Sequence, residues 1–167
     1  GLCVLITAFA DLSGAHFNPF VSLAMFFRKK IKGNLLKYYI PAQISGCLLG
    51  VMFANVFFEH SLLELSTKNR DGLHIFVSEI VATFGLIFII FATLKDGKTI
   101  VAISVATYIS AGYWFTSSTS FANPAVSLAR TFTDSFTGIN YLNTPTYILA
   151  EFIGLILAAY ILRIIYK

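Results

Sequence analysis

Apolar residues run through this chain in long windows separated by short polar segments. Three windows are long enough to cross a bilayer, which takes about 20 apolar residues. They are Leu35–Phe58, Leu73–Leu94 and Thr146–Tyr166. A fourth window, Thr99–Phe115, is slightly short, but charged and polar residues bound it on both sides. The pattern therefore predicts an all-α membrane protein in which each of these windows is a spanning helix.

Two further apolar stretches, Asn18–Phe27 and Asn123–Phe132, are too short to cross, and each opens with Asn-Pro. Proline suits the first helical turn because its missing N–H would be unbonded there, and the preceding asparagine can cap that turn. Non-helical backbone at membrane depth is tolerated only where protein or a water-filled cavity surrounds it. We therefore expect two re-entrant half-helices, one within residues 1–33 after the end of a span, and one within residues 118–133.

The composition agrees with a membrane protein. Hydrophobic residues make up 57% of the 167 residues and charged residues only 12%, whereas ordinary globular chains carry roughly a quarter charged residues. Disorder, a disulfide scaffold and nucleic-acid binding are excluded, and Cys3 and Cys47 lack metal-ligand spacing, so no metal is expected. The chain begins at Gly1 inside an apolar run, without the charged segment of a signal peptide. We expect one domain over residues 1–167 whose N-terminal part is missing.

The basic residues indicate an orientation in the membrane. When the predicted spans alternate, one side holds nine of the lysines and arginines and the other holds three, Lys68, Arg70 and Arg130. Because lysine and arginine accumulate on the cytoplasmic side, the segment Arg28–Lys37 is expected to be cytoplasmic. A lipid-headgroup site is the alternative interpretation of this basic cluster.

The two Asn-Pro segments are copies of each other. Ser13–Ala24 aligns with Ser118–Ala129 at a shift of 105 residues, and seven of the twelve positions agree. A second similarity aligns Ala42–Gly46 with Ala150–Gly154 at a shift of 108. Three predicted spans separate the two Asn-Pro segments, so the repeat has inverted topology. Inverted repeats with broken helices that meet at the midplane are typical of a transport pathway.

These residues resemble a known family. The two Asn-Pro segments look like the paired Asn-Pro-Ala motifs of the aquaporin and glycerol-facilitator (major intrinsic protein) family, and Gln43, Gly46 and Glu79 also match family positions. The resemblance implies an aquaporin-like inverted-repeat helical bundle of six spans and two half-helices, of which the first span and part of the second would be missing here. It also implies a homotetramer in a lipid bilayer and no cofactor.

The motif residues are Asn18, Pro19, Asn123, Pro124 and Ala125. Two helix N-termini that meet at the bilayer centre present unpaired N–H groups and positive dipole ends to one point. The two asparagine carboxamides would donate to a passing oxygen there, while a proton or cation would be repelled. The pair therefore predicts a single-file path for neutral solutes that excludes protons. The alternative is that both asparagines are simple helix caps, which two motifs in an inverted repeat disfavour.

Three ionisable residues fall near these motifs. Glu79 is the acid inside a predicted span, and the resemblance implies that it binds backbone of the second re-entrant loop, with a proton relay as the alternative. Glu151 aligns with Gln43 and is expected to be an interior hydrogen-bonding residue. His16 is expected to be a buried hydrogen-bonding residue that lines the cytoplasmic vestibule rather than a metal ligand.

The predicted selectivity constriction departs from the family pattern. The family usually has an arginine directly after the second motif, where this chain has Val126; the other readable constriction positions are Ser120 and Ala111 or Gly112. These small or aliphatic residues predict a wide, apolar constriction that passes glycerol-sized or larger solutes. Phe20, in place of the first motif's alanine, works against this expectation because its ring could narrow the path.

Arg130 lies one helical turn beyond Val126. It could place a positive charge at the outer vestibule, or it could form an ion pair with Asp134. The stretch from Gly112 to Arg130, with Asp134 following, resembles a bacterial subgroup associated with arsenic-resistance genes. The resemblance implies trivalent arsenic acids as solutes and a bacterial inner membrane as the location.

The predicted function is a passive channel for small neutral solutes: water, glycerol-like polyols and trivalent arsenic acids. A water-selective channel and a non-conducting truncated relic are the alternatives. His16, Glu79 and Glu151 are too scattered to form an active site, so we expect no enzyme. An ion-coupled carrier would show paired intramembrane acids that face the half-helices, and Glu79 alone does not form such a pair.

Overall fold

The computed structural model describes residues 1–166, and these residues form helices joined by loops. The α-helices are α1 (Leu2–Ser13), α2 (Pro19–Phe27), α3 (Gly33–Phe57), α4 (Leu73–Thr93), α5 (Lys98–Phe115), α6 (Pro124–Ala129) and α7 (Thr144–Ile165). Short 3-10 turns, Leu94–Asp96 and Arg130–Phe132, extend α4 and α6. The prediction of an all-α protein is therefore confirmed.

Three of the described helices are long and apolar enough to cross a membrane: α3, α4 with its 3-10 extension, and α7. The mean hydropathy of their most apolar windows is 1.6, 2.5 and 2.3. Each coincides with one of the three long apolar windows of the sequence. The fourth window forms α5, which is 18 residues long and is not among these three.

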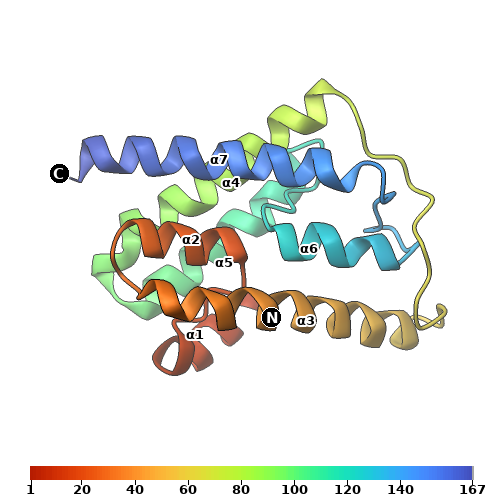
Figure 1. Ribbon diagram of the computed structural model, residues 1–167, viewed down its shortest axis with the longest axis horizontal. Coiled ribbons are helices and arrows are strands. Elements are labelled where there is room, and N and C mark those ends of the chain that lie inside the picture. Colours follow the sequence, from red (N-terminus) through yellow and green to blue (C-terminus); the bar gives the residue numbers. More distant parts are fainter. Residues whose placement is uncertain (167) are drawn as a thin grey trace.

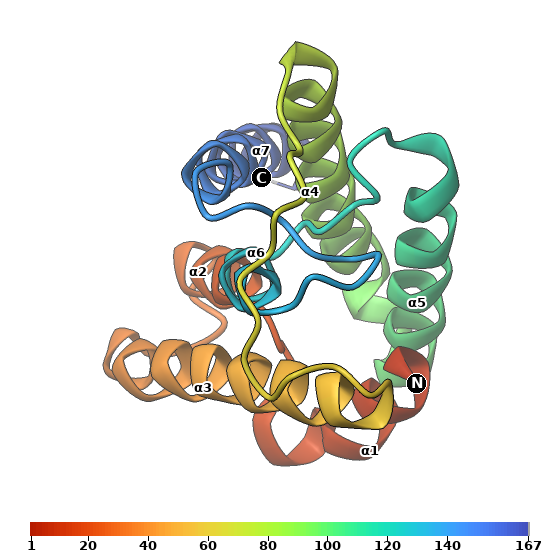
Figure 2. The ribbon, with the colours of Figure 1, turned by 90° about the vertical axis from the view of Figure 1, so that its right-hand side faces the viewer.

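The two short helices α2 and α6 lie end to end along the middle of the molecule, between α3 on one side and α7 on the other (Figure 1). The view along α6 shows α3, α4, α5 and α7 arranged around it (Figure 2). The bundle thus surrounds the two Asn-Pro segments, which places their N-termini together at its centre.

The central packing is close between α4 and α7. Gly154 of α7 lies so near α4 that a Cβ atom built there would be 2.6 Å from the Ile80 carbonyl oxygen. Beside this contact, Ile87 of α4 packs with Phe20 and Ala24 of α2 and with Leu155 of α7. This cluster fixes α2 against the two spanning helices.

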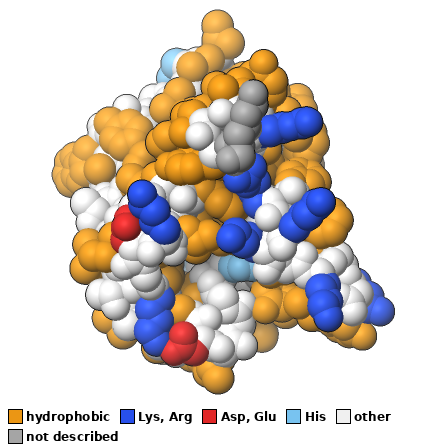
Figure 3. Space-filling view, turned by 90° about the vertical axis from the view of Figure 1, so that its left-hand side faces the viewer, with side chains coloured by type: hydrophobic (Ala, Val, Ile, Leu, Met, Phe, Trp, Pro, Cys, Tyr) orange, Lys and Arg blue, Asp and Glu red, His pale blue; other side chains and the backbone are white. Residues whose placement is uncertain are grey.

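Basic side chains gather at one end of the bundle. At this end α2 runs into α3, α4 runs into α5, and α7 finishes. Arg28 there donates to the Tyr166 carbonyl at 3.0 Å. Lys98 at the same end pairs with Asp11. Figure 3 views this end and shows lysine and arginine side chains spread over it, with hydrophobic side chains along the flanks.

Candidate functional site

Asn18 and Asn123 each begin a short helix. Both have extended backbone, with φ of −156° and −160°, and each is followed by proline at the first helical position. The Asn18 Oδ1 accepts from the Phe20 N–H at 2.9 Å, and the Asn123 Oδ1 accepts from the Ala125 N–H at 3.0 Å. The side-chain oxygens therefore cap the two helices and satisfy N–H groups that the helices leave unpaired.

The two carboxamide nitrogens tie the loops together. Asn18 Nδ2 donates to the Ala122 carbonyl at 2.7 Å, and Asn123 Nδ2 donates to the Phe17 carbonyl at 2.9 Å. Sequence reasoning missed this exchange, because a carbonyl far along the chain carries no residue signature. A carboxamide nitrogen has two hydrogens, so one on each asparagine remains for another acceptor.

The loops that lead into α2 and α6 share an unusual backbone conformation. Ala15 and Phe17 have φ of 48°, and the residues 105 positions later, Ser120 and Ala122, have φ of 50° and 48°. Non-glycine residues rarely adopt positive φ, so its recurrence at equivalent positions shows that the sequence repeat extends to the backbone. Such strained conformations cluster at functional sites.

Two buried carboxylates hold the second loop. Glu79 of α4 is fully buried, and its two oxygens accept from the Phe121 N–H at 2.9 Å and the Ala122 N–H at 2.8 Å. Glu151 of α7 is also fully buried and accepts from the Asn123 N–H at 3.1 Å and the Ser127 hydroxyl at 2.7 Å. Both acids therefore face backbone and hydroxyl donors within the protein.

The first loop is held by side chains other than carboxylates. His16 Nδ1 lies 3.0 Å from the Ser22 hydroxyl, and that hydroxyl accepts from Gln43 Nε2 at 2.9 Å. Tyr39 donates its hydroxyl to the Ser13 carbonyl at 2.7 Å, and its ring packs against that of His16. Within residues 1–166, no group of three histidine, cysteine or acidic side chains is placed to hold a metal ion.

A cavity of about 640 Å³ passes along these asparagines. Its lining runs from Lys30 and Lys98 at the basic end, past Asn18 and Asn123, to Arg130. A second cavity of about 600 Å³ continues beyond it, towards residues 133–137. The two cavities share three of their lining residues, Cys47, Val126 and Arg130. We call the place where they meet the neck.

Among the residues predicted for the vestibule and the constriction, His16, Ser120 and Val126 line this cavity. Ala111 does not, because the face of α5 that lines the cavity repeats every fourth residue and Ala111 lies off it, exposed on the outside. The placement of Ala111 at the constriction is therefore wrong. The residues of α5 on the lining face are Val101, Val105, Ile109 and Tyr113.

Phe20 does not narrow the path. Its ring packs against Phe152 of α7 at 5.9 Å between centroids, and it lines a separate, largely apolar cavity of about 940 Å³ on the other side of α2 and α6. The expected obstruction at the first motif is absent among the described residues, because Phe20 belongs to the packing between α2 and α7.

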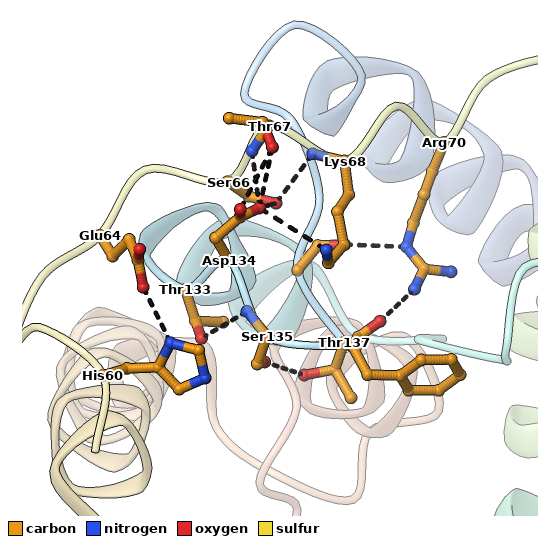
Figure 4. Close-up of polar contacts among 12 residues, drawn as sticks. His60, Glu64, Ser66, Thr67, Lys68, Arg70, Thr133, Asp134, Ser135 and Thr137 are labelled. Carbon is orange, nitrogen blue, oxygen red and sulfur yellow. Dashed lines mark hydrogen bonds and ion pairs between the residues drawn. The ribbon is translucent and has the colours of Figure 1, made fainter. Parts of the chain in front are cut away.

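Arg130 points into the neck and not towards Asp134. Its guanidinium lies 4.1 Å from the centre of the Phe121 ring, and Nη2 donates to the Tyr113 hydroxyl at 3.2 Å. Asp134 instead accepts from the Thr67 N–H at 2.8 Å and lies 3.9 Å from Lys68 Nζ (Figure 4). The ion-pair alternative for Arg130 is therefore wrong.

The sequence is similar to known proteins over nearly all its length. Residues 1–116 match the model of the major intrinsic protein family. The chain is 42% identical over 162 residues to aquaglyceroporin AqpS of Rhizobium meliloti (strain 1021), an alignment that covers 97% of this chain and 70% of that protein. It is 27% identical over 166 residues to aquaporin-4 of Rattus norvegicus, covering 94% of this chain and 51% of the relative. It is 26% identical over 171 residues to nodulin-26 of Glycine max, covering 98% and 62%.

Proposed function

The chain belongs to the major intrinsic protein family, and we propose that it is a passive channel in a multi-pass membrane protein for water and small neutral solutes of the glycerol type. The observation that carries the proposal is the pair of asparagines at facing helix N-termini, both on the wall of one elongated cavity. The similarity of the chain to an aquaglyceroporin supports solutes of the glycerol type.

In the proposed mechanism, Asn18 and Asn123 act as donors. Each has one carboxamide hydrogen bound to the opposite loop, so the other can donate to the oxygen of a solute. The N-termini of α2 and α6 add a positive potential at the same point, which opposes the passage of protons and cations. A neutral hydroxylated solute forms hydrogen bonds there, and because it carries no charge the positive potential does not repel it.

We further propose that α2 and α6 are re-entrant half-helices of an inverted repeat. The repeat of sequence and of backbone conformation at a shift of 105 residues supports this arrangement. The basic end of the bundle, with the segment Arg28–Lys37, would then face the cytoplasm, in accord with the positive-inside rule. Glu79 would be a scaffold for the second loop, because both of its oxygens are bound to backbone.

The solute range of the proposal includes trivalent arsenic acids, which are neutral polyhydroxylated molecules at pH 7. A homotetramer is the assembly that the family resemblance implies. Transport of the trivalent acids is measured as the arsenic content of cells that produce the chain. The tetramer is measured as the mass of the detergent-solubilised protein after subtraction of bound detergent.

The proposal is tested by reconstituting the purified chain in liposomes and following vesicle volume after an osmotic step. We expect glycerol and water fluxes above those of protein-free vesicles, linear in solute concentration and insensitive to a protonophore. Water flux alone would favour a water-selective channel. Fluxes equal to those of empty vesicles, with the helical content retained, would contradict the proposal.

A further inference from the structure

The cavity of about 940 Å³ that Phe20 lines is separate from the proposed path. It opens on the flank of the molecule, where α2 and α6 lie between α3 and α7 (Figure 2). No further helix of the described residues covers α2 and α6 on this side. We call this cavity the flank groove. It leaves the sides of both short helices open to whatever surrounds the protein.

The lining of the flank groove offers an occupant mainly hydrocarbon. Its apolar residues include Leu128 of α6 and Leu149 and Phe152 of α7. Two hydroxyls also belong to the lining, those of Thr131 and Thr144, and they lie 3.1 Å from each other as a hydrogen-bonded pair. Because these hydroxyls are bonded within the protein, an occupant gains free energy by burying apolar surface and not by forming new hydrogen bonds.

The flank groove extends over about one half of the membrane thickness. Phe20 lies next to the junction of α2 and α6 at the bundle centre, and the groove runs from there to the loop residues Leu65 and Tyr141. Along α7 it extends from Thr144 to Phe152, a distance of about 12 Å at 1.5 Å per residue. One leaflet contributes about 15 Å of hydrocarbon to a bilayer. The groove therefore matches the depth of a single leaflet.

The two ends of the flank groove suit the two ends of a phospholipid. At the inner end, the rings of Phe20 and Phe152 pack at 5.9 Å between centroids and close the floor. At the outer end, Tyr141 is 57% exposed, and tyrosine is typical of the headgroup level because its ring is apolar and its hydroxyl polar. Beyond the groove, α7 continues with the exposed residues Ile156 and Leu157, so the groove is continuous with an apolar surface.

We propose that the flank groove binds an acyl chain of a membrane phospholipid from the leaflet that lies away from the basic end. The ester and phosphate groups of this lipid lie level with Tyr141, and its chain covers the open sides of α2 and α6. Hydrocarbon is the surrounding medium at this depth, because α7 crosses the membrane. The inference does not depend on conduction, so a chain that conducts nothing in liposomes would refute the proposed function and leave the groove standing.

Quenching of tryptophan fluorescence by a brominated phospholipid tests the proposal, because bromine quenches only at close range. The chain has one tryptophan, Trp114, which is 91% exposed on α5, and Trp114→Phe gives a background without tryptophan. Phe152→Trp then places the probe in the groove, and Tyr160→Trp places it at an exposed position of α7 outside the groove. Each chain is purified in detergent that contains a few molecules of dibrominated phosphatidylcholine per protein.

We expect quenching at residue 152 to be several-fold greater than at residue 160, because detergent displaces lipid more readily from an open surface than from a groove. In liposomes of the brominated lipid alone, both probes should be quenched. Equal quenching of the two probes in detergent would overturn the proposal. An unquenched probe at residue 152 in those liposomes, with residue 160 quenched, would also overturn it, because protein would then cover the groove.

A second pair of variants measures lipid retention without a fluorescent probe. Leu149→Phe adds bulk inside the groove, whereas Leu157→Phe makes the same change at an exposed position of α7 outside it. The readout is the number of phospholipid molecules that stay bound to each detergent-purified chain, counted by native mass spectrometry. Leu149→Phe should lower this number several-fold and Leu157→Phe should leave it as in the wild type. Equal retention by all three chains would overturn the proposal.

Discussion

At the scale of single residues, the site depends on groups whose partners are backbone atoms. Glu79 accepts from two consecutive N–H groups of the second loop, which no other described acceptor satisfies. Each N–H would otherwise be buried and unpaired, at a cost of about 1–3 kcal/mol. The carboxylate therefore stabilises the positive-φ conformation that precedes Asn123.

Glu79→Gln should destabilise the folded chain by about 1–3 kcal/mol. Glutamine has one accepting oxygen, and its NH₂ group would face an N–H donor, so one backbone donor loses its partner. The measurement is the thermal unfolding temperature in detergent. Glu59→Gln, at an exposed position after α3, is the control and should have no effect. Equal unfolding temperatures for the two variants would refute the scaffold role.

Val126→Arg tests which residues form the narrowest part of the path. Val126 lines both cavities at the neck, so a long cationic side chain there should reduce glycerol flux more than water flux. Volume changes of liposomes give both fluxes from one preparation. Equal losses of both would show that residue 126 does not set the constriction.

The residue scale is also where sequence reasoning reached its limit. The Asn-Pro pairs, Glu79 and His16 could be identified as site residues, because their chemistry is unusual inside apolar segments. The direction of the Phe20 side chain and the face of α5 on which Ala111 lies could not be predicted, because both depend on which neighbouring helix packs against each face. The position of Arg130 could not be decided for the same reason, since the sequence is compatible both with a charge at the outer vestibule and with an ion pair to Asp134.

At the scale of helices, the fit between α4 and α7 depends on small residues. Gly154 lets the two helices approach closely. Its counterpart in the repeat is Gly46 of α3, where a Cβ atom would meet nothing within 4 Å. The long apolar windows predicted where the helices lie, but the sequence alone does not show which of two equivalent glycines is in contact.

These two glycines form a matched pair of variants. Gly154→Ala should destabilise the chain by about 1–3 kcal/mol, because the added methyl group overlaps backbone that cannot move aside. Gly46→Ala should leave stability unchanged or slightly raised, since alanine is the better helix former. Thermal unfolding in detergent compares them directly. A larger loss from Gly46→Ala would contradict the packing described.

At the scale of the whole molecule, two loops are bonded to each other at one end of the bundle. Asp134 joins them: it accepts from the Thr67 N–H and both threonine and serine hydroxyls, and it faces Lys68 (Figure 4). The hydrogen bond from the Thr67 N–H, helped by the neighbouring hydroxyls and Lys68, lowers the pKa of Asp134. The charged carboxylate therefore favours the paired loops.

The pairing of the loops should weaken in acid. Because the pKa of Asp134 is lowered on folding, its contribution is present above the ordinary pKa of aspartate and is lost as pH falls through the lowered value. The protection factor of the Thr67 amide, which is the intrinsic exchange rate at each pH divided by the observed rate, should fall over that range in the wild type. Asp134→Asn should make this protection factor independent of pH there, whereas Asp71→Asn, exposed in the same loop, should retain the fall. The same profile in both variants would exclude Asp134 as the cause.

The reciprocal bonds at the centre of the path have a consequence for biosynthesis. Asn18 and Asn123 reach partners 104 and 106 residues away along the chain. Until the second loop has been synthesised, the Asn18 carboxamide lacks the Ala122 carbonyl to which it donates. Contacts between residues so far apart along the chain slow folding, so the centre of the path cannot be completed before the second half of the chain is made.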